Sequence, residues 1–240
     1  LSNTKRWCLW LKGVTPAELS QLPMVRQRLA GVRDARLASP TETTNELANV
    51  PTLFAQDRQP DHDYLAIPEV SSENRRFIPM TFLSANVIAS NKLLTLNGAT
   101  LFHFGVLSST MHMAWVRHIC GRLKSDYSYA PSVYNNFPFP KTNEVQLKAI
   151  EQAAQGVLDA RASFADSSLA DLYDPLAMPP ELTKAHAVLD RVVDRAYRPQ
   201  PFANERLRME FLFRLYEVEV GPLAAALKRR GTRRTETLQS

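Results

Sequence analysis

The fold is decided by the stretch from residue 64 to residue 107, which reads YLAIPEVSSENRRFIPMTFLSANVIASNKLLTLNGATLFHFGVL. Short apolar and β-branched runs alternate in it with turn residues, a pattern typical of short strands. Asn97-Gly98 separates two of these runs. Both central residues of a type I′ turn need a positive φ, which this dipeptide tolerates. We therefore predict a small, largely antiparallel sheet with a hairpin at Asn97-Gly98.

Upstream of this stretch the sequence predicts helices. Thr15-Pro-Ala-Glu18 is a capping box with proline at the first helical position, so a helix should begin there. Pro23 interrupts it, and apolar residues at helical spacing predict a second helix over 24–36. Residues 5–11, KRWCLWL, are a strand candidate, and the polar segments between residues 39 and 63 have the composition of loops.

Downstream of the sheet the pattern becomes helical. Residues 108–123 form one candidate helix, with a serine cap and an apolar residue at every fourth position. Three more amphipathic stretches, joined by proline-bearing loops, cover 143–164, 180–197 and 204–220. We predict an α+β fold: a mixed domain with a small sheet and a packed helix over 1–142, an all-helical unit over 143–222 and a basic, disordered tail over 223–240.

The net charge of +5 is unevenly placed. Residues 1–142 hold 15 Lys and Arg against 10 Asp and Glu, whereas the remainder holds 14 of each kind. A surplus of this size permits contact with nucleic acid without proving it.

The two cysteines lie far apart in the sequence and belong to no Cys/His cluster, which argues against a disulfide framework or a zinc site. No apolar run has the length of a membrane span, and no signal peptide is visible. We expect a reduced, soluble, cytoplasmic protein. Because the chain begins with Leu1 rather than Met, we also expect it to be a fragment of something longer.

Catalytic motifs are scarce in the sequence. No two glycines are two positions apart, so a glycine loop for a dinucleotide or for S-adenosylmethionine is missing. No Asp/Glu-x-Lys tripeptide indicates a metal-dependent nuclease, and the five histidines form no metal-binding pair. Asn136-Phe-Pro-Phe139 approaches the Asn-Pro-Pro-aromatic tetrapeptide of amino-methyltransferases but lacks its first proline, so a core-plugging role is favoured. We predict no catalytic residue and no metal ligand in this chain.

The segment Lys124-Ser-Asp-Tyr-Ser-Tyr129 alternates polar and aromatic residues. In a strand, residues two apart share a face, so the polar side chains of Lys124, Asp126 and Ser128 should face outward and the tyrosines inward. A lysine beside an aspartate can read one G·C pair, because the ammonium donates to guanine O6 and N7 and the carboxylate accepts from cytosine N4. An ordinary solvated sheet edge explains the same pattern, and the residues alone favour that interpretation.

The chain resembles a known family in this region. The motifs RRFIP, VIASN, LFHFGVLSS, MHMAWVR, CGRLKSDY and YNNFPFP occur in the order found in the target-recognition region of type IIL, MmeI-like restriction-modification enzymes and their methyltransferase-only relatives, such as those of phage-defence systems. The resemblance covers nearly all of residues 5–142. The helical remainder resembles the C-terminal portion of that family more loosely.

The resemblance implies that residues 1–142 are a DNA target-recognition domain of a longer N6-adenine DNA methyltransferase, which in some members is fused to a nuclease. It places specificity positions after CGRL, at Lys124, Asp126 and Ser128, and so favours the base-reading interpretation. S-adenosylmethionine would bind in the parent's catalytic domain, with no cofactor in this fragment. The implied partners are double-stranded DNA and that methyltransferase domain in cis, with the protein monomeric and away from membranes. Basic residues that could contact phosphates are Arg75, Arg76, Lys92, Arg117 and Arg122.

Two alternatives stay open from the sequence. One is a protein–protein interaction module without base readout, whose binding would be insensitive to salt. The other is a free-standing enzyme that uses His103, which we place in a strand, or Asn136. The loop at 41–49 carries two glutamates, which argues against DNA contact by that loop.

Overall fold

The computed structural model describes residues 6–236, and the side chains up to residue 220. The described residues form two compact units, 6–59 and 60–236. Within the described part of the chain, no helix is both long enough and apolar enough to span a membrane.

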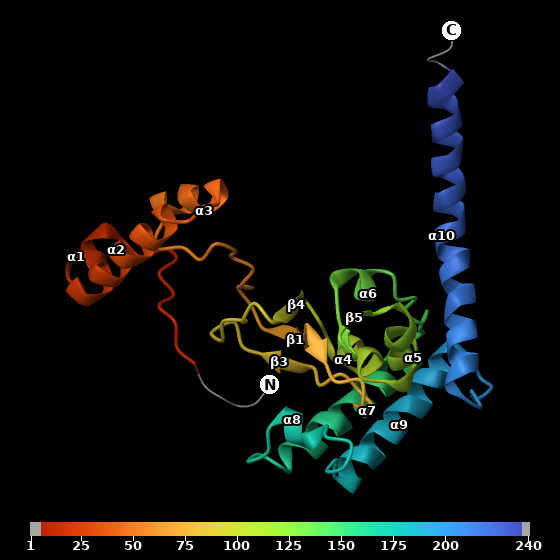
Figure 1. The fold of residues 1–240 in the computed structure, drawn as a ribbon. Helices are drawn as coiled ribbons and strands as arrows, with labels where there is room; N and C mark the ends of the chain where they lie inside the picture. The colour runs from red at the N-terminus through yellow and green to blue at the C-terminus, as the bar shows by residue number, and fades with distance from the viewer. Residues whose placement is uncertain (1–5, 237–240) are drawn as a thin grey trace. The chain divides into compact units, whose positions relative to one another are not determined.

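The N-terminal unit is helical. It contains α1 (Pro16–Ser20), α2 (Pro23–Leu37), α3 (Glu42–Glu46) and the 3-10 helix η1 (Leu47–Asn49) (Figure 1). The predicted capping box is confirmed, since Thr15 Oγ1 accepts from Glu18 N at 3.3 Å while Thr15 N donates to the Glu18 carboxylate at 2.8 Å. The second predicted helix, over 24–36, is α2, which begins one residue earlier at Pro23. The predicted strand over 5–11 is wrong for its described part, because residues 6–11 belong to no strand.

Two small antiparallel sheets form the β part of the second unit. In the first, β1 (Tyr64–Pro68) lies between β3 (Thr81–Leu83) and β4 (Leu93–Asn97). In the second, β6 (Asp126–Ser128) lies between β2 (Val70–Ser71) and β5 (Gly121–Leu123). All five residues of β1 are buried, which explains its nearly continuous apolar run. Only Glu69 separates β1 from β2, so one chain segment links the two sheets.

The predicted hairpin at Asn97-Gly98 is wrong. Gly98 has a positive φ of 66°, but Asn97 does not, and the chain continues into α4 (Leu101–Leu107) rather than into a strand. Thr100 caps this helix and His103 Nδ1 accepts from its backbone N–H at 3.2 Å, so His103 lies on a helix and not in a strand. The run is short, and short apolar runs do not distinguish a strand from a buried helix by periodicity.

The helix predicted over 108–123 is α5 (Thr110–Ile119), with Ser109 as its N-cap. It ends four residues before the predicted position, because Cys120 is extended and the next three residues form β5. A short helix, α6 (Pro131–Asn135), follows β6.

The C-terminal helices α7 (Glu144–Ala162), α9 (Pro180–Tyr197) and α10 (Glu205–Glu236) correspond to the predicted amphipathic stretches, whereas the short α8 (Leu169–Leu172) lies between two of them and was not predicted. Figure 1 shows α7 and α9 beside each other, and α4 also contacts α7 while α5 contacts α10. α10 continues to Glu236, into the segment 223–240 for which the sequence predicts a basic, disordered tail. Residues 237–240 lie outside the described residues.

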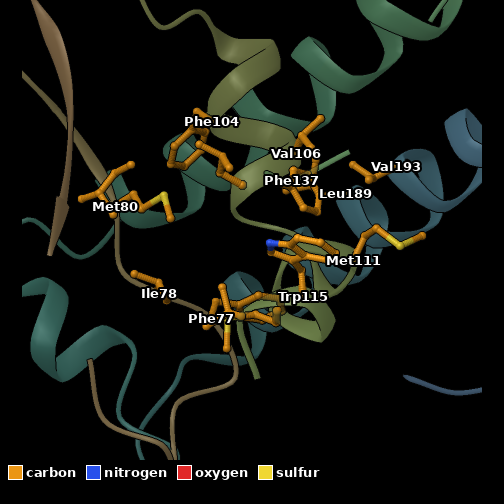
Figure 2. Packing of buried hydrophobic residues seen from close by; sticks show 14 of the residues in the cluster. Phe77, Ile78, Met80, Phe104, Val106, Met111, Trp115, Phe137, Leu189 and Val193 are labelled. Atoms are coloured by element: carbon orange, nitrogen blue, oxygen red, sulfur yellow. The ribbon is translucent and has the colours of Figure 1, made fainter. Parts of the chain in front are cut away.

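One hydrophobic core joins elements from both sides of residue 142, where the sequence predicts a domain boundary. Trp115 lies among side chains from the sheet loops, from α4 and from α9 (Figure 2). The residues labelled there are Phe77, Ile78, Met80, Phe104, Val106, Met111, Trp115, Phe137, Leu189 and Val193. The predicted α+β fold class, with its small antiparallel sheets and helical C-terminal part, is confirmed.

A buried polar cluster crosses the same boundary. Arg161 on α7 is 7% exposed and donates to the Met80 carbonyl at 2.7 Å and to the Tyr173 hydroxyl at 2.8 Å. His186 Nε2 on α9 lies 2.7 Å from the same hydroxyl, and its ring stacks on Phe77 with centroids 3.9 Å apart. Because buried polar groups are costly without partners, these bonds fix how α7 and α9 meet the sheet loops.

Candidate nucleic-acid interface

The segment 121–128 is a β-hairpin and not the single strand that the sequence predicts. β5 and β6 pair with Leu123 opposite Asp126 and Gly121 opposite Ser128, so Lys124 and Ser125 form the connecting turn. Lys124 has a φ of 57°, a left-handed conformation that residues other than glycine seldom adopt. Lys124 is exposed at the tip of the hairpin, so it does not share a strand face with Asp126 and Ser128 as predicted. It remains two residues from Asp126, across the turn.

The face argument holds for the rest of the segment. Tyr127 and Tyr129 are 3% and 1% exposed, whereas Asp126 and Ser128 are partly exposed. The tyrosines therefore anchor the hairpin in the core and leave the polar side chains of β6 on the outside.

Tyr129 is anchored by a buried histidine on α5. His112 Nδ1 lies 2.8 Å from the Leu107 carbonyl and Nε2 lies 2.9 Å from the Tyr129 hydroxyl. Complete burial lowers the pKa of His112 to about 4, so the ring is neutral at pH 7. A carbonyl can only accept, so Nδ1 carries the proton and Nε2 accepts from the Tyr129 hydroxyl. Burial also raises the pKa of Tyr129, which keeps that hydroxyl protonated.

The loop after β2 lies against the hairpin. Glu73 N donates to Asp126 Oδ1 at 3.4 Å, and the Glu73 carboxylate is 3.8 Å from the Arg122 guanidinium. Arg75 and Arg76 follow in the same loop; Arg76 is exposed and its guanidinium lies 5.6 Å from the Phe77 ring centroid. Arg75 and Arg76 therefore lie in the loop whose residue Glu73 contacts the hairpin, and Arg122 lies on β5 of the hairpin itself.

Lys92 also borders the second sheet. Its ammonium is 3.2 Å from the carboxylate of Glu69, the residue between the two sheets. The carbonyl of Glu69 accepts from Tyr129 N at 2.7 Å. The Lys92 side chain is 72% exposed, so the ion pair does not remove it from solvent.

Arg117 is placed differently from the other basic candidates. It lies on α5 and forms an ion pair with Glu205 at the start of α10. This contact ties α5 to α10 and gives Arg117 a structural role.

The residues of the alternative enzyme hypothesis are engaged in local structure. His103 completes the cap of α4, as described above, and Asn136 Nδ2 donates to the Ser132 carbonyl at 2.8 Å beside the end of α6. Phe137 is 5% exposed and contacts Trp115 and His112 edge-on, so it plugs the core. Among the described residues no group of three or more His, Cys, Asp or Glu side chains could hold a metal ion.

A small two-sheet domain that presents a charged hairpin and continues into packed helices has the architecture of a target-recognition domain. Comparison with known families agrees: residues 1–141 match the MmeI target recognition domain, and residues 142–223 match the MmeI C-terminal domain. Because the first match alone covers more than half of the chain, the chain belongs to the MmeI family.

Two relatives are informative. DNA methyltransferase A of Bacillus subtilis (strain 168) is 38% identical over 213 residues, which are 88% of this chain and 24% of that protein. The solved structure of the type IIL restriction-modification enzyme MmeI in complex with DNA is 47% identical, with a TM-score of 0.88 over 92% of this chain and 30% of that chain. The chain thus spans less than a third of the length of either relative.

Sequence reasoning missed the role of Glu73 at this site. Its contacts with Asp126 and Arg122 join segments about 50 residues apart, and no local pattern indicates such a contact. The pairing of β2 with β6, which brings the loop to the hairpin, is the structural signal that was needed.

Proposed function

We propose that this chain is the DNA-recognition part of a site-specific N6-adenine DNA methyltransferase, and that the β5–β6 hairpin reads bases in the major groove. The observation that carries the proposal is the hairpin itself: a charged turn exposed to solvent and held by two buried tyrosines, in a domain whose family includes an enzyme solved in complex with DNA. A two-stranded β-ribbon fits into the major groove of B-DNA.

In this proposal Lys124 donates to guanine O6 and N7, and Asp126 accepts from the N4 amino group of the paired cytosine. Asp126 Oδ1 already accepts the Glu73 N–H, so its other oxygen is the one that faces the base. Ser128, on the same face of β6, contributes to an adjacent position.

Phosphate contacts orient the duplex and carry no sequence information themselves. We assign them to Arg75 and Arg76, in the loop after β2, and to Lys92, which pairs with Glu69 between the two sheets. Arg117 is not assigned this role, because it forms an ion pair with Glu205. Phosphate contacts give binding that weakens steeply with salt, which separates this function from that of a protein–protein interaction module.

Methyl transfer belongs to the longer polypeptide. Among the eight glycines of this chain no two lie two positions apart, so the chain does not fit S-adenosylmethionine and we assign the cofactor to a methyltransferase part outside it. When bound there, the cofactor supplies the methyl group. This chain orients the duplex for that reaction as a monomer in the cytoplasm, where the DNA substrate is found.

The test is selection from a randomised duplex pool at low salt, with the whole chain and with the double variant Lys124→Glu, Asp126→Arg. The variant exchanges donor and acceptor, so the two selected motifs should differ by inversion of one G·C pair. A charge exchange on α7, Lys148→Glu with Glu144→Lys, is the matched control, because it also conserves net charge and lies at an exposed ion pair. If the hairpin variant selects the same motif as the unchanged chain, the base-reading assignment is wrong.

A further inference from the structure

The guanidinium of Arg122 is held by three groups of the protein around the Lys124–Ser125 turn. It lies 4.2 Å from the centroid of the Tyr127 ring, within the range of a cation–π interaction. Its Nη1 donates to the Ser125 carbonyl at 2.8 Å and is 3.8 Å from the Glu73 carboxylate. The side chain is 40% exposed, so it is partly withdrawn from solvent.

The position of Arg122 follows from strand register. Arg122 on β5 is directly opposite Tyr127 on β6, and directly opposite residues of an antiparallel pair share a face. Tyr127 is also opposite Ser71 of β2, so it occupies the middle of the three-stranded sheet. Arg122 therefore covers the ring of the central residue, and from there its guanidinium reaches forward to the turn.

The turn needs such support. Lys124 adopts a positive φ, which costs a residue with a Cβ free energy, and strained conformations persist only where surrounding contacts fix them. The hydrogen bond from Arg122 to the Ser125 carbonyl is such a contact within the turn. Glu73 adds a second link, since its N–H binds the Asp126 carboxylate while its own carboxylate faces Arg122.

We propose that Arg122 is a positioning residue and not a phosphate contact: it holds the Lys124–Ser125 turn in the conformation that aims Lys124 and Asp126 at one base pair. The proposal rests on the proposed function for its DNA part, but the support of the turn exists without DNA. The sequence alone groups Arg122 with the phosphate-contacting arginines; its contacts assign it to the hairpin.

The first experiment measures amide hydrogen exchange of the whole chain without DNA. In Arg122→Met, exchange of the amides of residues 121–128 should rise about tenfold, the size expected from losing one cation–π contact and one hydrogen bond. Amides of α7 should not change. Arg122→Lys keeps the charge but loses the planar fork, so it should not restore protection. Unchanged exchange of the hairpin in Arg122→Met would overturn the proposal whatever the protein binds.

Two variants of neighbouring residues serve as controls in that experiment. Arg76→Met removes an exposed arginine from the adjacent loop and should leave exchange of the hairpin unchanged. Glu73→Gln removes the partly exposed ion pair but keeps the N–H that binds Asp126, so its effect should stay below about twofold.

The second experiment separates positioning from phosphate contact. With DNA, Arg122→Met should reduce discrimination about tenfold at the base pair that the Lys124/Asp126 exchange inverts, and it should leave the salt dependence of binding unchanged. Arg76→Met should instead weaken binding to all sequences and lower the slope of log K against log salt by about 0.9. The reverse result for Arg122, a lower slope with discrimination intact, would show a phosphate contact and refute the proposal. If the unchanged chain selects no motif, the proposed function fails, and hydrogen exchange alone then decides whether Arg122 supports the turn.

Discussion

The contact between α4 and α7 gives a prediction that can be worked out from one atom. A Cβ added at Gly105 on α4 would lie 2.9 Å from Ile150 Cγ2 and 3.1 Å from the Cβ of Ala154, both on α7. Ile150 and Ala154 are fully buried, so neither side chain can move into solvent. The third neighbour, the Ile150 carbonyl oxygen at 3.4 Å, belongs to the backbone and cannot rotate away as a side chain can.

We expect Gly105→Ala to destabilise the protein in spite of its better helix propensity. Replacing a helical glycine by alanine contributes about 0.5–1 kcal/mol to stability, whereas overpacking a buried site costs about 1–3 kcal/mol. Gly156 on α7 is the matched control, because a Cβ there meets nothing within 4 Å and should give the propensity gain alone. The two variants should therefore differ by about 1–3 kcal/mol in the free energy of unfolding.

Urea and thermal unfolding of the whole chain measure this difference. At about 2–4 °C per kcal/mol for a chain of this size, Gly156→Ala should raise Tm by a few degrees and Gly105→Ala should lower it by a similar amount. Gly105→Ala as stable as Gly156→Ala would refute the close approach of α4 and α7.

Two further predictions concern buried polar groups. Arg161→Met should cost about 3 kcal/mol or more in unfolding free energy, because it leaves the Met80 carbonyl unpaired. Arg191→Met, at an exposed position, is the control and should cost less than about 0.5 kcal/mol. Equal losses for the two variants in urea titrations would contradict a stabilising role for the buried hydrogen bonds of Arg161. Lowering the pH from 6.5 to 4.5 should destabilise the protein. Burial lowers the pKa of His112 to about 4 and of His186 to about 3, so the unfolded chain binds two protons that the folded chain does not. Burial raises the pKa of Asp190 to about 6, so the folded chain takes up one proton that offsets one of these. The net difference of one proton lowers the free energy of unfolding by up to about 1.4 kcal/mol per pH unit. A free energy of unfolding that stays constant over this pH range in urea titrations would argue against neutral buried histidines.

Local signals in the sequence were sufficient where the interactions are local. The capping box at Thr15 depends on residues three apart, and it is present. The dipeptide Asn97-Gly98 is also a local signal, but it failed, because Gly98 with its positive φ also suits the turn that leads from β4 into α4. The dipeptide carries no information about strand pairing, and β4 pairs with the earlier strand β1 rather than with a strand after Gly98.

The roles of the candidate site residues stay a prediction, whereas the geometry of their segment was predicted only in part. The alternation around Tyr127 identified which side chains face outward, since a period of two is a property of any strand. The turn was missed because Lys124-Ser125 has neither the glycine nor the asparagine that usually indicates a positive φ. The hydrogen bond from Arg122 to the Ser125 carbonyl is local, but the contact of the Glu73 loop with Asp126 comes from pairing between the sequence-distant strands β2 and β6.

This arrangement separates the stability of the hairpin from what its tip presents. Tyr127 and Tyr129 are buried and bonded to the core, whereas Lys124, Asp126 and Ser128 contribute little apolar burial, so replacing them should leave the fold intact. The replacements are not equivalent, however. A positive φ at position 124 disfavours β-branched residues and favours glycine, asparagine or aspartate, so the backbone restricts which side chains can stand at the proposed base-reading position before any contact with DNA is considered.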